Sequence, residues 1–144
     1  MMAMEFADEL LRMIRVDQRV RARSFHEARY APCPYGVQVR LPTGALVFLQ
    51  TVTAPPTGTV SRPDTGEPAP VSEPMELPEE GPTELADVER WLARLITTDR
   101  SPRIEEVRLF QNRRGRAAIP HGLHLRLHSG GQAWIYVRRS GLRY

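Results

Sequence analysis

The chain has 144 residues, of which 41% are hydrophobic and 26% charged, the composition of a globular domain with its own core. Cys33 is the only cysteine, which excludes an intramolecular disulfide. The longest uninterrupted apolar run, Ala45 to Leu49, is far too short to cross a membrane, and acidic residues stand where a signal peptide would be basic. We therefore expect a cytoplasmic protein without membrane contact.

The twenty basic residues are all arginine, and their distribution is uneven. Residues 1–53 hold seven Arg against five acids, residues 54–99 three against ten, and residues 100–144 ten against two. Exclusive use of arginine is typical of high-GC bacterial genomes, although arginine also suits bidentate recognition of phosphate or carboxylate. The basic last third predicts either an anionic partner or pairing with the acidic middle of the chain.

The first predicted element is an amphipathic helix over residues 4–23, because apolar residues recur there near helical spacing: Phe6, Leu10, Ile14 and Val20. Pro32 and Pro34 then exclude a helix and introduce a β-hairpin at about 35–52. With a three-residue loop, the expected cross-strand pairs form one apolar face: Val37 with Leu49, Val39 with Val47, and Leu41 with Ala45.

Residues 54–82 are predicted to form an acidic, proline-rich linker or an extended wrap along the surface. They contain eight of the thirteen prolines and six acidic residues, without a hydrophobic period. This composition predicts a stiff, extended segment that contributes nothing to a core.

The C-terminal part predicts one helix and three strands. Apolar spacing places a helix at about 84–97, where Trp91 would pack against a sheet. A strand is expected at 103–111, a turn at 112–116, and a second hairpin at about 121–139. In this hairpin we expect Leu127 opposite Ala133, Leu125 opposite Ile135, Leu123 opposite Val137, Arg126 across from Trp134, and His124 across from Tyr136.

The two hairpins share features that simple alternation does not require: Gly36 with Gly122, Arg40 with Arg126, and Ala45 with Ala133. Internal duplication is one explanation, and two unrelated hairpins with a common β pattern are the other. The expected fold is α+β, with a mainly antiparallel sheet built from the two hairpins, each preceded by an amphipathic helix. Residues 1–53 would form an α-β-β unit and residues 83–144 an α-β-β-β unit, packed as one compact domain.

The polar face of the second hairpin is the candidate binding site. Rings and guanidinium groups alternate there, a pattern that suits stacking on bases and attraction to phosphates. The alternative is ordinary packing, with the rings covered and Arg126 lying along Trp134. The predicted binding residues are Arg113, Arg114, Arg116, His124, Arg126, His128, Trp134, Tyr136 and Arg138.

These residues predict a small non-catalytic binding or assembly protein that presents a basic, aromatic sheet face to nucleic acid or an acidic protein surface. One alternative is a metal-independent ribonuclease, with His124 or His128 as base and Arg126 and Tyr136 as phosphate clamp and proton donor. Another is a structural subunit of a homo-oligomer or larger assembly. On one strand His124 and His128 stand about 13 Å apart, too far to chelate one ion, so we predict no metal and no cofactor.

Overall fold

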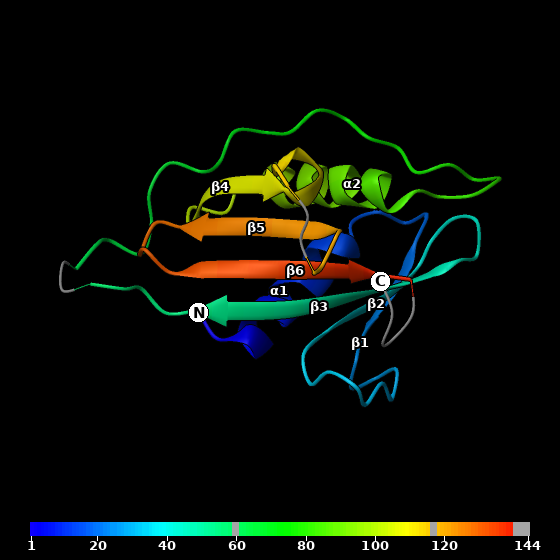
Figure 1. The fold of residues 1–144 in the computed structure, drawn as a ribbon, viewed down its shortest axis with the longest axis horizontal. Coiled ribbons are helices and arrows are strands. Elements are labelled where there is room, and N and C mark those ends of the chain that lie inside the picture. Colours follow the sequence, from blue (N-terminus) through cyan, green and yellow to red (C-terminus); the bar gives the residue numbers. More distant parts are fainter. Residues whose placement is uncertain (59–60, 116–117, 140–144) are drawn as a thin grey trace.

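The computed structural model describes residues 1–58, 61–115 and 118–139 (Figure 1). The strands form one antiparallel sheet in the order β1-β2-β3-β6-β5-β4. An α+β fold with a mainly antiparallel sheet, as predicted, is therefore confirmed. The elements are α1 (Ala3–Ile14), β1 (Arg21–Ser24), β2 (Gly36–Arg40), β3 (Leu46–Ala54), α2 (Leu85–Thr98), β4 (Ile104–Leu109), a 3-10 helix (Phe110–Asn112), β5 (Gly122–Leu127) and β6 (Gln132–Arg138).

Both helices cover the same face of the sheet, and Figure 1 shows them behind it. The predicted apolar faces of the two hairpins are buried against the helices, where Trp91 is 1% exposed. One continuous core therefore spans both halves of the chain. Neither described helix has the length and apolar character needed to cross a bilayer.

The predicted first helix is too long, because α1 ends at Ile14 and the strand β1 follows a turn. In the turn, Asp17 accepts a hydrogen bond from the backbone N–H of Arg19 at 3.0 Å. Such local bonds from an Asp side chain compete with helical hydrogen bonding and favour a turn. Val20 is buried, but it lies beyond the helix.

The register of the first hairpin is as predicted, with Val37 paired to Leu49 and Val39 to Val47. The register predicted for the second hairpin is wrong by two residues. Leu123 pairs with Ile135, and His124 pairs with Trp134 rather than Tyr136. The reason is a tighter loop, closed by a hydrogen bond from the N–H of Leu127 to the carbonyl oxygen of Gly131.

The two hairpins have the same geometry, and corresponding residues are displaced along the chain by a constant number of positions. Both loops are closed by equivalent backbone hydrogen bonds, and β1 pairs with β2 as β4 pairs with β5. This common geometry is what a duplication would produce, while the duplication itself stays a prediction. The matched pairs include Gly36–Gln50 with Gly122–Tyr136, and Arg40–Leu46 with Arg126–Gln132. The predicted match of Ala45 with Ala133 is wrong, because the position of Ala133 corresponds to that of Val47.

The segment predicted at 54–82 as a linker or a surface wrap is extended and runs beside β4 and α2 (Figure 1). It is here called the wrap. Backbone hydrogen bonds join Gly66 to Pro102 and Ala69 to Ile104 at the start of β4. The expectation that this segment adds nothing to a core is wrong at two positions, because Ala69 and Leu77 are buried in it.

Gly36 and Gly122 occupy equivalent, closely packed positions, so we predict that alanine is poorly tolerated at both. A Cβ atom would overlap a buried phenylalanine ring and a backbone carbonyl oxygen at either position. Gly36→Ala and Gly122→Ala should each lower the free energy of unfolding by about 3 kcal/mol, measured by chemical denaturation. Gly44→Ala is the control, since its Cβ meets nothing within 4 Å and only the φ of 92° opposes alanine. There the loss should be about 1 kcal/mol; equal losses would contradict the close packing.

Asp17 joins the end of α1 to α2, because its carboxylate accepts a hydrogen bond from Trp91 Nε1 at 2.9 Å. Burial opposes ionisation, but hydrogen bonds from Arg19 and Trp91 outweigh it and hold the pKa of Asp17 below its ordinary value. We predict that Asp17→Asn lowers the free energy of unfolding at pH 7 by about 1–2 kcal/mol.

The contribution of a carboxylate with a depressed native pKa is present above the unfolded pKa and lost as the pH falls through the native one. The stabilities of wild type and Asp17→Asn should therefore converge below about pH 4. Urea denaturation at pH 7 and in acid measures this difference. Trp91→Phe, which keeps the ring but removes the donor, serves as the companion variant, and a difference independent of pH would contradict the assignment.

Candidate anion-binding site on the open sheet face

The face of the sheet opposite the helices, here called the open face, carries half-buried polar and aromatic side chains. Side chains alternate between the two faces of a strand, so the buried residues of β5 and β6 leave their neighbours on the open face. Two rows cross β4, β5 and β6. The first row is Arg108, His124 and Trp134, and the second is Glu106, Arg126 and Gln132.

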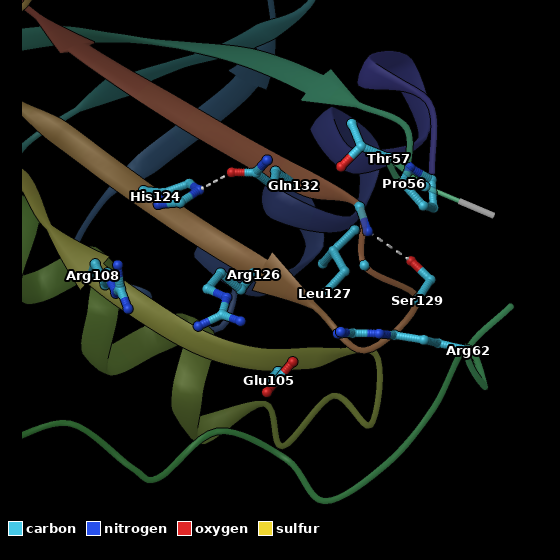
Figure 2. A pocket seen from close by; sticks show the side chains of 13 residues that line it. Pro56, Thr57, Arg62, Glu105, Arg108, His124, Arg126, Leu127, Ser129 and Gln132 are labelled. Carbon is cyan, nitrogen blue, oxygen red and sulfur yellow. Dashed lines mark hydrogen bonds between the residues drawn. The ribbon is translucent and has the colours of Figure 1, made fainter. Parts of the chain in front are cut away.

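Four residues of these rows, Arg108, His124, Arg126 and Gln132, line a pocket of about 540 Å³, here called the C-terminal pocket (Figure 2). Arg108 and Arg126 come from β4 and β5, and Arg62 approaches from the wrap. The hairpin loop between β5 and β6 and the segment after β3 supply the rim. The lining residues are Pro56, Thr57, Gly58, Arg62, Glu105, Arg108, His124, Arg126, Leu127, Ser129, Gly130, Gly131 and Gln132.

Glu106 partly neutralises the arginines of this pocket. Its carboxylate accepts hydrogen bonds from Arg108 Nε at 2.8 Å and from an Arg126 terminal nitrogen at 3.3 Å. The bond from Arg108 is the main reason that the pKa of Glu106 is lowered, with a further contribution from Arg126. The pocket lining also includes the carboxylate of Glu105, and the guanidinium of Arg62 makes no ion pair or hydrogen bond within the described part of the chain. Three arginines and two carboxylates, Glu105 and Glu106, leave one positive charge in excess.

A ring stack borders the pocket. The imidazole of His124 lies parallel to the Trp134 ring, with centroids 5.2 Å apart and planes inclined by 13°. His124 Nε2 lies 2.7 Å from Gln132 Oε1, which fixes the imidazole in this orientation. Val52 of β3 is the next residue in the row, so the indole has a ring on one side and a shorter aliphatic side chain on the other.

The structure places four of the predicted site residues on β6 and in the preceding hairpin loop, in different surroundings. Trp134 lies beside the C-terminal pocket, whereas Tyr136 contacts Phe110 with centroids 6.2 Å apart. Arg138 donates a 2.7 Å hydrogen bond to Gln50 on β3. His128 lies beside the wrap, with Nε2 2.7 Å from the carbonyl oxygen of Glu67, and does not line the pocket.

Arg113 and Arg114, in the turn before β5, lie at the opposite end of that strand from the pocket. Arg113 stacks over Phe110 at 3.5 Å and donates a hydrogen bond to the carbonyl oxygen of Ile119 at 2.7 Å. Arg114 is exposed, and Arg116 lies outside the described residues. His124, Arg126 and Trp134 are thus the members of the predicted set that the structure brings together.

Sequence reasoning missed Arg62 and Arg108 as neighbours of Arg126. A register shift between Ile104 and Glu106 interrupts the alternation of β4, and this irregularity hides which face Arg108 occupies. Had β4 been aligned correctly with β5, the position of Arg108 beside His124 would have been evident. Arg62 carries no signal in the sequence, because its place depends on the path of the wrap.

The three histidines near the second hairpin have separate partners. His121 lies 2.7 Å from the buried carboxylate of Glu89, whereas His124 contacts Gln132 and His128 contacts the wrap. Across residues 1–58, 61–115 and 118–139, no group of three or more His, Cys, Asp or Glu side chains is placed to hold a metal ion. The arrangement of the pocket favours anion binding by arginine.

The chain matches no family model, no curated protein and no solved structure.

Proposed function

We propose that this is a non-catalytic binding protein whose open face binds single-stranded nucleic acid. The observation that carries the proposal is the convergence of Arg62, Arg108 and Arg126 on one pocket beside the stacked rings of His124 and Trp134. Guanidinium groups attract the phosphates of a strand, and an aromatic ring offers a surface on which an unpaired base stacks.

The ring stack favours nucleic acid over an acidic protein surface. An acidic protein needs only positive charge, whereas a polynucleotide presents charge and flat rings at regular intervals. Trp134 has His124 on one side and the shorter Val52 on the other, so a base would stack on the indole from the side of Val52. Single-strand binders that use a sheet combine such aromatic platforms with a positively charged groove.

The ribonuclease and the structural subunit stay predictions. A two-histidine mechanism would need His124 and His128 at one site, but His128 lies against the wrap and outside the lining of the C-terminal pocket. Nothing in the pocket favours cleavage over binding.

We predict opposite effects from two substitutions that change the charge of the pocket in opposite directions. Arg126→Ala should weaken binding of a 12-nucleotide single strand about tenfold and reduce the logarithmic salt slope by about 0.7, the value of one phosphate contact. Glu106→Gln should strengthen binding several-fold, because the carboxylate that now repels phosphate is removed. Fluorescence anisotropy at two salt concentrations measures both effects.

Arg90→Ala is the matched control, since Arg90 lies on α2 and pairs with Asp87 away from the open face. It removes the same charge and should change affinity less than twofold. Gel analysis of the same samples tests for cleavage. Salt-independent binding, or an Arg90→Ala loss equal to that of Arg126→Ala, would contradict the proposed site.

The stacking part of the proposal is tested by Trp134→Ala. Loss of one base–aromatic stack should cost about 1–3 kcal/mol of binding, measured by the same anisotropy titration. The salt slope should remain that of the wild type, because no phosphate contact is removed. Circular dichroism must show a wild-type fold for the comparison. An unchanged affinity would show that Trp134 packs in the sheet and stacks with no base.

A further inference from the structure

We infer that the open face carries a second phosphate-binding site, in a pocket formed by β1 and β2. This N-terminal pocket has a volume of about 310 Å³ and is lined by Arg21, Ala22, Arg23, Gln38, Arg40 and Leu46. The N-terminal pocket shares no lining residue with the C-terminal pocket. The inference therefore goes beyond the proposed function and can be tested independently of it.

The N-terminal pocket is the structural counterpart of the C-terminal one. Strand pairing matches Arg40 with Arg126, Gln38 with His124, Leu46 with Gln132, and Arg23 with Arg108. The remaining position differs in charge, because Arg21 pairs with Arg40 where Glu106 pairs with Arg126. Three arginines therefore occupy strand positions whose counterparts on β4 and β5 are two arginines and a glutamate.

The three guanidinium groups have no carboxylate among the residues that line the pocket. Arg23 Nε contacts Gln38 Oε1 at 3.4 Å, and Arg40 donates a 3.4 Å hydrogen bond to the carbonyl oxygen of Gly44. The guanidinium of Arg21 makes no hydrogen bond or ion pair within the described residues. Long, neutral contacts of this kind leave most donors available to a ligand.

Like charges directly opposite each other on neighbouring strands destabilise a sheet. Arg21 and Arg40 form such a pair, and Arg23 lies on the same face two residues from Arg21. An anion placed between them would convert this repulsion into attraction. A phosphate group suits the position, because its oxygens accept bidentate hydrogen bonds from planar guanidinium groups.

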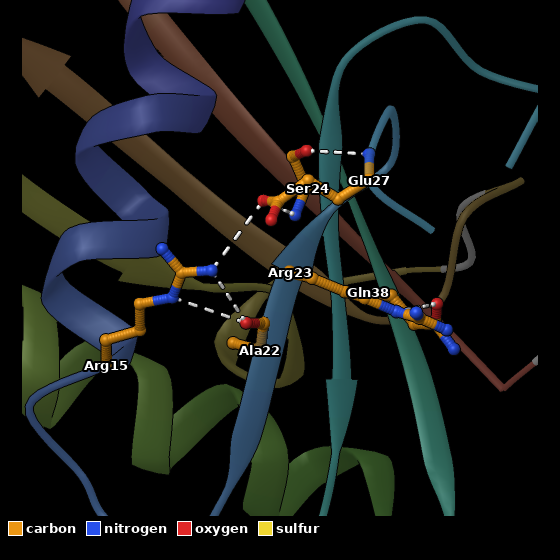
Figure 3. Close-up of polar contacts among 6 residues, drawn as sticks. All are labelled: Arg15, Ala22, Arg23, Ser24, Glu27 and Gln38. Atoms are coloured by element: carbon orange, nitrogen blue, oxygen red, sulfur yellow. Dashed lines mark hydrogen bonds and ion pairs between the residues drawn. The ribbon is translucent and has the colours of Figure 1, made fainter. Parts of the chain in front are cut away.

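The acidic side chains near β1 interact chiefly with groups outside the pocket. Figure 3 shows Arg23 extending toward Gln38, whereas Arg15 and Glu27 lie on the helix side of β1. The pKa of Glu27 is lowered chiefly by hydrogen bonds with Ser24, and Arg15 and Arg23 contribute less. Asp17 pairs with Arg19, whose pKa is also raised by Glu76 and Glu79 of the wrap.

Substitution of Arg21 by glutamate recreates the charge pattern of the C-terminal pocket, where Glu106 is accommodated without loss of the strand. The variant Arg21→Glu should therefore fold, while the charge on the pocket arginines falls from three positive charges to a net one and the affinity for phosphate falls with it. Arg90→Glu on the helical side provides the same change in net charge. The probe is inorganic tripolyphosphate, titrated into each full-length protein by isothermal calorimetry at low salt.

Wild type and Arg90→Glu should bind tripolyphosphate with affinities within twofold of each other, and Arg21→Glu should bind at least tenfold more weakly. A second arm distinguishes a free polyphosphate from a nucleic-acid backbone, using single strands of 4 to 16 nucleotides, the range of known sheet-binding sites. If a backbone occupies the pocket, Arg21→Glu weakens only the strands long enough to reach both pockets. If the ligand is a free polyphosphate, Arg21→Glu leaves all strand affinities unchanged.

Either pattern supports the site, and they differ in the source of the phosphate. The inference is overturned if Arg21→Glu and Arg90→Glu behave alike with tripolyphosphate and with every strand length. If instead the proposed function is wrong, Arg126→Ala will not weaken the binding of single strands. The difference between Arg21→Glu and Arg90→Glu in tripolyphosphate binding would then still be observed.

Discussion

The pairing of β3 with β6 is the interaction on which the rest of the structure depends. It is the junction between the two halves of the sheet, and it runs from Phe48–Arg138 to Ala54–Gln132. Gln50 and Tyr136 occupy equivalent positions in the two hairpins and pair with each other. An approximate two-fold axis therefore passes between them. Because α1 and α2 cover the same face, this axis is perpendicular to the sheet, and the opposite face remains free of helices.

The same axis explains why the open face has a pocket at corresponding strand positions in each half of the sheet. Backbone pairing places corresponding side chains in corresponding rows, whereas the wrap and the β5–β6 loop line the C-terminal pocket alone. Glu106 holds Arg108 and Arg126 through hydrogen bonds of 2.8 and 3.3 Å, whereas Arg21 adds a third positive charge to Arg23 and Arg40. The two-fold axis turns the two pockets in opposite directions along a bound strand. A phosphate group is compact and can be bound from either direction, so both pockets can bind phosphates of one strand.

Much of the fold could be predicted from the sequence because alternation in a strand has a period of two. Both hairpins, their buried faces and the position of α2 follow from apolar spacing. The error of two residues in the second register moved the partner of His124 from Trp134 to Tyr136, but it kept every side chain on its correct face. The residues predicted to lie on the open face were therefore correct, whereas the predicted cross-strand pairs of the second hairpin were wrong.

The candidate site was predicted less well because it depends on elements with weak sequence signals. The strand β1 has the sequence Arg-Ala-Arg-Ser, too short and polar to show alternation, and it follows α1 after a brief turn. Its assignment to the preceding helix concealed the arginines of the N-terminal pocket. The position of β1 is fixed by pairing with β2, an interaction between distant residues that local periodicity does not report.

The carboxylates of the acidic wrap could in principle neutralise the arginines of the open face within the molecule. Arg94 and Arg100 bind the wrap through the carbonyl oxygens of Ser72 and Ala69, and His128 contacts that of Glu67. Backbone groups fasten the segment, and no carboxylate within its described part forms an ion pair. Ion pairing with the carboxylates of the wrap is therefore not what holds the basic residues in place. The excess positive charge of the open face remains available to an anion from outside.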